Sequence, residues 1–473
     1  MARLCEHTAS ELAALLRRRE ASCVELLEDL LARIDHLNPR LNAIVTLDRE
    51  GARLQAQAAD AQAADAQADA AGRRGALHGV PFTLKDCFET AGMRTTAGHP
   101  PLADHVPAGD STVAARLKAA GGILLGKTNV PPLAMSLQTS NDIFGRTSNP
   151  WDPSRTPGGS SGGAAAAVAA GLVPFDIGSD MSGSIRIPAH YCGIYGFKPT
   201  ANRVPGTGHI PPPPGMARMD RQLGSYGPLA RSIDDLELLT ALLVGPDGSD
   251  VEVAPVPWRR APAREPKSLR ILWRSSWNGV PTASAVRAAV EQVARRLEDA
   301  GAVVEEGDPG FSREQLMTVW EAGFPLISAA AMELMGASLP VKAEPAAANG
   351  LVAWIKVQAA RDPLVRAIDD ILARRFDAFL CPAANGNAFV HSAPRAPFEI
   401  DGNLVDSRFV DHYLFPFNLL GNPCVVIPAG LAPDGLPVGV QLVGPRYGDE
   451  ALLAVAQAVD MVVAGYRQPP PWD

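Results

Sequence analysis

Cysteine and clustered histidine, the usual signs of disulfides and metal centres, are sparse in this 473-residue chain. Its six cysteines are scattered without any CxxC spacing, which argues against a disulfide framework or a zinc site and suits free thiols in a reducing compartment. Its nine histidines form neither an HExxH motif nor another ligand cluster. We therefore expect no metal centre.

Long apolar runs and runs of like charge are also missing. No stretch of about 18 uninterrupted apolar residues occurs, and the first residues lack the charged and then apolar pattern of a secretion signal. The formal net charge is −8, whereas nucleic acids and anionic membranes select basic patches. We therefore predict a cytoplasmic protein that binds neither nucleic acid nor membrane.

The composition is that of a folded chain with a substantial core. Hydrophobic residues make up 47% and charged residues 20% of the sequence, which is typical of soluble globular proteins. Two capping boxes, each a hydroxyl residue followed three positions later by glutamate, predict helices that begin after Thr8 and after Ser22. The second helix is predicted to end at Asn38-Pro39.

Strand and helix signals alternate over most of the remaining sequence, which predicts an α/β protein. Short apolar runs bounded by glycine and proline predict buried strands at 122–125 and 174–177. Residues 268–274, 284–299 and 302–306 have the patterns of a strand, a helix and another strand.

No linker in the sequence is long enough to separate independent domains, so we predict a single domain over residues 1–473. Its chemically informative core spans about 76–235. A mostly helical region at about 311–375 carries Trp320 and Phe324, interrupts the strand pattern and is predicted to cover a cleft like a cap. The sequence does not decide the oligomeric state, and a homodimer stays open.

Two serines in separate glycine-rich strings indicate an enzyme. Ser160 lies in Pro-Gly-Gly-Ser-Ser-Gly-Gly, and Ser184 lies in Gly-Ser-Asp-Met-Ser-Gly-Ser. Glycine lets backbone N–H groups approach a reacting carbonyl, and a serine hydroxyl placed there can attack it. Because a hydroxyl is a weak nucleophile until a base takes its proton, Lys85 is the candidate base.

Two short patterns point to other functions. Residues 121–128 match the phosphate-binding string GxxxxGK[ST], but that loop opens a helix, and Pro131-Pro132 prevents a helix here. Residues 158–162 match the GxSxG nucleophile elbow of α/β-hydrolases, which requires an apolar strand before it and a later histidine. Only His391 and His412 are placed for that role, and this interpretation stays open as an alternative.

The serine strings, taken with others far along the chain, resemble the amidase signature family. The resemblance rests on Thr-Pro-Gly-Gly-Ser-Ser-Gly-Gly at 156–163, on the stretch 178–200, on Gly-Val-Pro-Phe-Thr-Leu-Lys-Asp at 79–86 and on the late glycine-rich string at 435–444. It covers about residues 10–460, and the combination of strings is highly specific.

The resemblance implies a large mixed, mostly parallel central β-sheet covered by helices on both faces. It also implies a Ser–cisSer–Lys triad, in which Ser184 is the nucleophile, Ser160 the bridging serine with a cis peptide, and Lys85 the terminal base. To act near neutral pH, the lysine needs its pKa lowered from about 10.4, and burial acts in that direction. The resemblance further implies an oxyanion hole made by the backbone N–H groups of Met181, Ser182, Gly183 and Ser184.

One departure from the family pattern lies beside the nucleophile. Ser182 stands where the family usually has glycine, and a side chain is tolerated there only if the backbone φ is negative. A second departure, Ala164 in place of a common serine, is expected to be harmless.

We predict an amide-bond hydrolase that forms a serine acyl-enzyme and needs no cofactor. Met216, Met219 and Pro211–Pro214, with the aromatic residues of 311–375, are predicted to line an apolar pocket, although a core role for them stays open. This favours a small-molecule substrate, namely a hydrophobic or aryl amide, an anilide or a carbamate, with an ester side activity. A glutamine-dependent amidotransferase subunit is the other alternative, although the loop at 208–221 does not resemble that branch.

Overall fold

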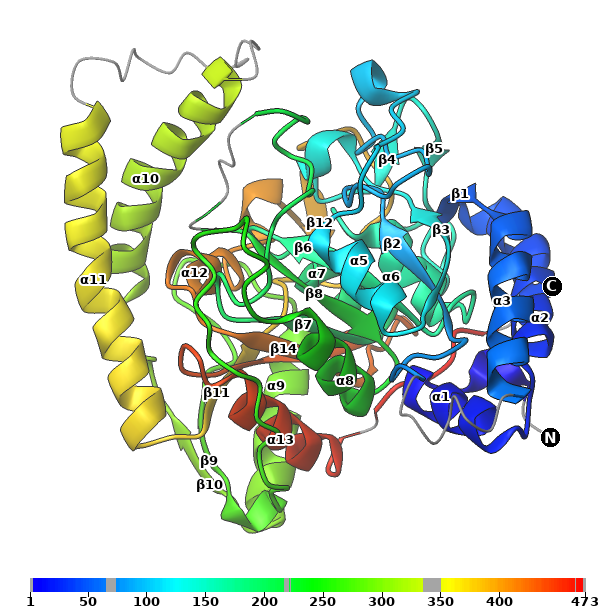
Figure 1. Ribbon diagram of the computed structural model, residues 1–473. Helices are drawn as coiled ribbons and strands as arrows, with labels where there is room; N and C mark the ends of the chain where they lie inside the picture. The colour runs from blue at the N-terminus through cyan, green and yellow to red at the C-terminus, as the bar shows by residue number, and fades with distance from the viewer. Residues whose placement is uncertain are drawn as a thin grey trace.

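A large β-sheet runs through the molecule and collects strands from residue 44 to residue 443 (Figure 1). The computed structural model describes residues 3–64, 74–216, 221, 223–334, 350–463 and 465–470. Within these residues the sheet has eleven strands, which are, in spatial order, β1 (Ile44–Leu47), β3 (Ile123–Thr128), β2 (Pro81–Lys85), β6 (Phe175–Asp180), β8 (Ser225–Ala230), β7 (Tyr195–Lys198), β14 (Cys424–Leu431), β15 (Pro437–Val443), β11 (Ala378–Pro382), β9 (Arg270–Trp273) and β10 (Val303–Glu306).

The expected large mixed sheet is confirmed, but the expectation that it is mostly parallel is wrong. Of the ten neighbouring strand pairs in the described sheet, four are parallel and six are antiparallel. Antiparallel pairs form both between strands joined by a short turn and between strands far apart in the sequence. Strands β14 and β15, for example, form a hairpin through residues 432–436.

Helices cover both faces of the sheet. Helices α6 (Gly162–Ala169) and α7 (Arg186–Cys192) pack against each other and against central strands, and α9 (Ser284–Asp299) packs against β11 and β15. Helices α8 (Ile233–Leu243) and α13 (Asp449–Asp460) form another packed pair over β7, β8 and β14. The short helix α5 (Thr112–Ala119) packs against α8.

The N-terminal helices begin where their capping boxes predict. Helix α1 (Ala9–Arg18) is capped by Thr8 and α2 (Cys23–Leu41) by Ser22, whose side chains accept hydrogen bonds from the N–H groups of Glu11 and Glu25. Together with α3 (Arg49–Ala64), these helices lie at one end of the sheet (Figure 1).

The predicted end of α2 at Asn38-Pro39 is wrong, because the helix continues to Leu41. A proline in the last turn removes only one backbone donor. The final turn is closed instead by Asn42, which has a left-handed conformation and donates its N–H to the carbonyl of Asn38.

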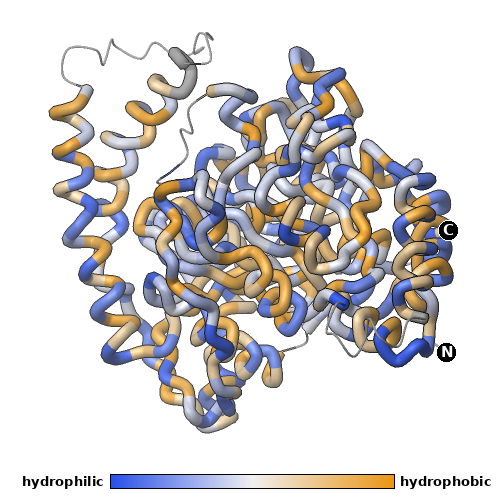
Figure 2. Tube along the Cα trace, viewed as in Figure 1, coloured by the Kyte–Doolittle hydropathy of each residue, from blue (hydrophilic) through white to orange (hydrophobic). Residues whose placement is uncertain are grey.

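Within the described residues, the region predicted to be mostly helical forms α10 (Arg313–Leu334) and α11 (Gly350–Arg374). The two helices pack against each other at one side of the sheet (Figure 1). Hydrophobic and hydrophilic stretches alternate along both (Figure 2), as expected for helices that turn one face toward the protein. The short helix α12 (Phe415–Leu419) packs beneath them through Phe415 and Trp320, whose rings stack at 4.3 Å.

The other described strands form two small hairpins, β4 (Ser140–Asn141) with β5 (Gly145–Arg146) and β12 (Phe398–Ile400) with β13 (Asn403–Val405). Short 3-10 helices lie at Leu4–Glu6, Pro100–Leu102, Pro132–Ala134, Pro266–Ser268 and Ser407–Phe409. None of the described helices is long and apolar enough to cross a lipid bilayer.

Candidate active site

Two neighbouring strands and a glycine-rich loop bring Lys85 and Ser160 into direct contact. Lys85 is the last residue of β2, which pairs in parallel with β6, and Ser160 lies just before α6. The Lys85 Nζ atom lies 2.7 Å from Ser160 Oγ and 2.9 Å from the hydroxyl of Ser179 on β6. Both Lys85 and Ser160 are completely buried, so these contacts are made away from bulk water.

Burial determines the charge state of this lysine. Removal from water lowers the pKa of Lys85 to about 8, although the neighbouring acidic groups of Cys87, Asp180 and Asp176 oppose the shift. An amine with this pKa is neutral in an appreciable fraction of molecules near neutral pH, and only a neutral amine can accept a proton.

The loop that carries Ser160 is held close to its surroundings. The Gly159–Ser160 peptide bond is cis. A side chain at Gly159 would place its Cβ 2.5 Å from the carbonyl oxygen of Ser136, so only glycine fits there. The next residue, Ser161, donates its backbone N–H to the carbonyl of Ser184 at 3.1 Å, which ties this loop to the other serine segment.

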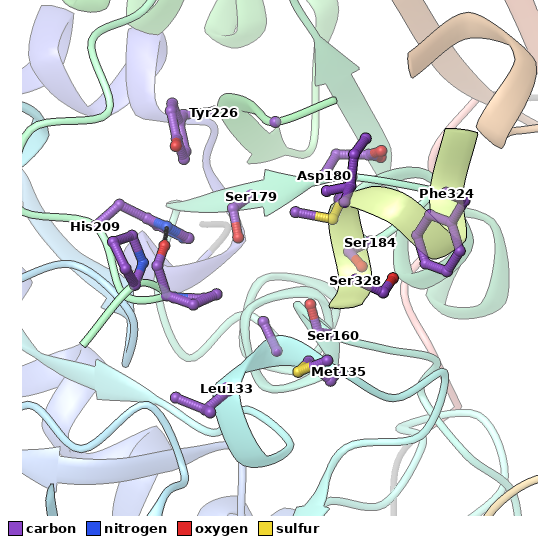
Figure 3. A pocket seen from close by; sticks show the side chains of 16 residues that line it. Leu133, Met135, Ser160, Ser179, Asp180, Ser184, His209, Tyr226, Phe324 and Ser328 are labelled. Carbon is purple, nitrogen blue, oxygen red and sulfur yellow. Dashed lines mark hydrogen bonds between the residues drawn. The ribbon is translucent and has the colours of Figure 1, made fainter. Parts of the chain in front are cut away.

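Ser184 is half-buried and lines the same cavity as Ser160 and Ser179 (Figure 3). Both Ser160 and Ser184 are within the described residues, and the structure records no hydrogen bond between their hydroxyls. In enzymes without a ligand such bonds are often long and tighten only when the substrate binds.

The backbone around Ser184 is organised by the carboxylate of Asp180. Asp180 accepts a hydrogen bond from the Gly183 N–H at 2.8 Å and another from the Ile185 N–H at 3.0 Å. For the described residues, no hydrogen bond is recorded from the N–H groups of Met181, Ser182 and Ser184. Of the four N–H groups expected in an oxyanion hole, three are thus available, and that of Gly183 is already engaged.

The loop accommodates a side chain at position 182 because the positive backbone φ angle is that of the next residue, Gly183. Gly183 has a φ of 120°, and a Cβ there would lie 2.5 Å from a side-chain carbon of Leu414. Ser182 is not among the residues of positive φ. Burial raises the pKa of the nearby Asp411 carboxyl to about 7, and the Ser182 side chain acts against this shift.

A buried ion pair holds Asp180 in place. The Arg186 guanidinium forms two hydrogen bonds to its carboxylate, at 2.8 and 3.0 Å, and both side chains are fully buried. Burial alone would raise the pKa of the Asp180 carboxyl, but Arg186 holds it well below its usual range. Arg186 also donates to Gln441, to the Leu414 carbonyl and to Asn418.

The cavity beside Ser184 has a volume of about 110 Å³ and mostly apolar walls. Its lining comes from β8, from α10 and from the loops around residues 133–135 and 211–212. Figure 3 shows Phe324 and Ser328 of α10 on one side of the cavity and His209 and Tyr226 on the other.

Only some of the residues predicted to line an apolar pocket line this cavity. Pro211 and Pro212 line the cavity, whereas Met216 is 42% exposed and is not among its lining residues. Met219 lies outside the described residues. The region 311–375 contributes Phe324 to the cavity, while Trp320 stacks behind it.

The structure gives no support to the two short patterns. Neither His391 nor His412 is among the described residues that line the cavity, and burial lowers the pKa of each to about 4. Most of the phosphate-loop match at 121–128 forms strand β3, and the short 3-10 helix Pro132–Ala134 follows instead of an α-helix. Among the described residues, no group of three or more side chains could hold a metal ion.

Sequence reasoning did not single out Ser179, His209 or Tyr226, which also line the cavity. Of these, Ser179 was the easiest to predict from the sequence, because it lies in the same string as Ser184 and on a strand that pairs with the one carrying Lys85. His209 and Tyr226 carry no such signal, since only the folded chain brings them to the cavity.

Comparison with known proteins gives a consistent picture. The family model described as Amidase matches residues 25–453. A glutamyl-tRNA(Gln) amidotransferase subunit from Roseiflexus sp. (strain RS-1) is 34% identical over 99% of both chains, and an acylamidase from Rhodococcus erythropolis is 31% identical over 96% of this chain and 95% of its own. The crystal structure of a bacterial aryl acylamidase of the amidase signature family has a TM-score of 0.81 and 27% identity, with 96% of each chain covered.

Replacing Arg186 by leucine should strongly destabilise the protein, because Asp180 would keep a buried charge without a partner. We expect the free energy of unfolding in urea to fall by about 3–5 kcal/mol. Arg18→Leu, which removes the exposed Arg18–Glu20 pair, is the matched control and should change the free energy of unfolding far less, because solvent screens an exposed pair. Equal losses in both variants would contradict the role given to the buried pair.

Proposed function

Because the chain belongs to the amidase signature family, we propose that it hydrolyses amide bonds with Ser184 as nucleophile, Ser160 as bridging hydroxyl and Lys85 as base. The observation that carries this proposal is the 2.7 Å contact between the buried Lys85 Nζ and Ser160 Oγ, beside a cavity that Ser184 also lines. The reaction requires no cofactor.

The first half of the reaction transfers the acyl group to the enzyme. Neutral Lys85 takes the proton of Ser160, which takes the proton of Ser184 as the Ser184 oxygen attacks the amide carbonyl. The C–N bond of the tetrahedral intermediate then breaks, and the proton returns from Lys85 through Ser160 to the leaving nitrogen. An amine departs and an ester to Ser184 remains.

The second half repeats these steps with water. Water gives a proton through Ser160 to Lys85 as its oxygen attacks the ester carbonyl. The bond to Ser184 breaks, and Ser184 regains the proton, so that the carboxylic acid leaves and the enzyme returns to its starting state. Ser179, whose hydroxyl lies 2.9 Å from Lys85 Nζ, is a positioning residue for the amine.

Charge on the carbonyl oxygen is stabilised by the backbone N–H groups of Met181, Ser182 and Ser184. A single donor of this kind typically contributes about 2.7–4 kcal/mol to transition-state stabilisation. The Gly183 N–H serves the loop instead, since it donates to Asp180.

The cavity favours an uncharged apolar substrate. Its volume of about 110 Å³ approaches that of an engineered apolar cavity of about 150 Å³ that binds benzene. No lysine or arginine is among its described lining residues. We therefore propose a hydrophobic or aryl amide, an anilide or a carbamate as substrate, with weaker activity on the corresponding esters.

The similarity to amidotransferase subunits supports a second candidate, the release of ammonia from glutamine for a partner enzyme. A bound glutamine would need a cation for its α-carboxylate, and the described lining residues include neither lysine nor arginine.

A substrate panel separates these two candidates. We expect the purified chain to cleave 4-nitroacetanilide and an aryl carbamate with a kcat/KM at least tenfold above that for acetamide, and to release no ammonia from glutamine. Glutaminase activity together with a partner that co-purifies from the native source would favour the second candidate. A preference for acetamide would refute the apolar pocket.

Ser184→Ala should abolish hydrolysis while the protein stays folded. Because removal of a covalent nucleophile removes the acyl-enzyme route, we expect kcat to fall by at least about 10⁴-fold. A fluorophosphonate probe should label the wild type on Ser184 and leave the variant unlabelled, as read by mass spectrometry. Retained activity in this variant, with loss in His391→Ala or His412→Ala, would establish the α/β-hydrolase alternative.

The pH profile should report the titration of Lys85. Since only the neutral amine is active and its pKa is about 8, kcat/KM should rise about tenfold per pH unit below pH 8 and level off above it. Lys198→Met is the matched control, because it removes another buried lysine with a pKa of about 8, and it should keep this limb. A wild-type profile that is flat between pH 6 and pH 9 would contradict the assignment.

A further inference from the structure

A second, smaller hollow lies between α10 and α11, directly behind the cavity that holds the serines. Its walls include Trp320, Trp354 and Val357. Two residues of α10, Phe324 and Ile327, line both the hollow and the main cavity. These two side chains are therefore the wall between the two spaces.

The larger part of this wall is a single ring. Phe324 stacks on Trp320 with ring centroids 4.5 Å apart and an angle of 19° between the planes. The other side of the phenyl ring faces the main cavity, where Figure 3 shows it close to Ser328. Phe324 is 37% exposed, so it is held less firmly than a core residue.

The space behind the ring is lined mostly by apolar side chains, with Gln358 and Arg361 also on its walls, and it is too small to be used as it stands. Its volume is about 10 Å³, which is at the lower limit of what a single water molecule requires. The helices approach closely here, because a Cβ at Gly323 would lie 2.9 Å from a methyl group of Val357. A substrate group can therefore enter this hollow only if the Phe324 ring is removed or moves away.

We propose that Phe324 is a specificity-determining residue that sets the maximum length of the apolar group bound beside Ser184. The hollow between α10 and α11 receives the distal part of a straight acyl chain once the ring is removed. The proposal rests on the proposed amide hydrolysis and names the part of the chain that limits its substrate range.

The test is a series of 4-nitroanilides with straight acyl chains of four to ten carbons. In Phe324→Ala, each further methylene that becomes buried should raise kcat/KM about fourfold, the equivalent of about 0.8 kcal/mol. We expect the ratio of the decanoyl to the butyryl substrate to increase at least tenfold over wild type. The butyryl substrate, which is too short to reach the hollow, should gain less than the longer substrates do.

A second substitution distinguishes the hollow from a general loosening of the cap. Trp354 lines the hollow and not the main cavity. Trp354→Ala alone should therefore leave the chain-length ratio unchanged, while adding it to Phe324→Ala should raise the ratio further for the longest chains. Val352→Ala, an exposed position on the same helix and outside both spaces, is the control for effects of altering α11.

Two results would overturn the proposal. One is a Phe324→Ala enzyme, shown to be folded by circular dichroism, whose chain-length ratio equals that of wild type. The other is a Trp354→Ala enzyme that shifts the ratio as much as Phe324→Ala does.

The failure of the proposed function would look different. In that case wild type and variants would cleave none of the anilides. The wall would then be tested by isothermal titration with decanoate and butyrate as probes, and Phe324→Ala should bind decanoate at least tenfold more tightly than wild type does. Equal binding by both proteins would overturn the proposal without reference to catalysis.

Discussion

The removal of Lys85 from water is the constraint on which the site depends. A lysine on the surface would be almost entirely protonated at neutral pH and would have no lone pair for a serine proton. In this protein Lys85 lies at the end of β2, a fully buried strand, where the protonated form is disfavoured. Its amine has two hydroxyl partners, those of Ser160 and Ser179. These hydroxyls can donate to the neutral amine or accept from the ammonium, so both protonation states remain satisfied.

The loop around Ser184 is likewise held by a buried polar group whose hydrogen bonds are all made within the protein. Asp180 is buried with Arg186 and accepts the N–H groups of Gly183 and Ile185. One backbone donor of the proposed oxyanion hole, the Gly183 N–H, is thereby committed to the shape of the loop. The geometry of the other donors depends on this buried carboxylate, which itself does not need to touch the substrate.

The sequence was most informative where chemistry demands particular residue types. Lys85, Ser160 and Ser184 stand in short strings whose glycines are required by close approach, as at Gly159 and Gly183. Capping boxes located α1 and α2 because the hydroxyl and the carboxylate act over three residues of one chain segment. What the sequence could not provide is set by long-range packing. The antiparallel majority of strand pairs depends on how connections cross the sheet, and periodicity within a strand does not report the direction of its neighbour. The exposure of Met216 and the placement of Tyr226 and His209 at the cavity are decided by segments distant in the chain.

The position of α10 and α11 outside the sheet has an evolutionary consequence. Lys85, Ser160 and Ser179 belong to the middle of the fold, where a change of backbone would disturb several strands at once. The apolar side chains of α10 are borne on a peripheral pair of helices (Figure 1). Proteins that descend from one ancestor with this fold can therefore change their substrate range through mutations in the α10–α11 pair, while the residues in the middle of the sheet stay the same.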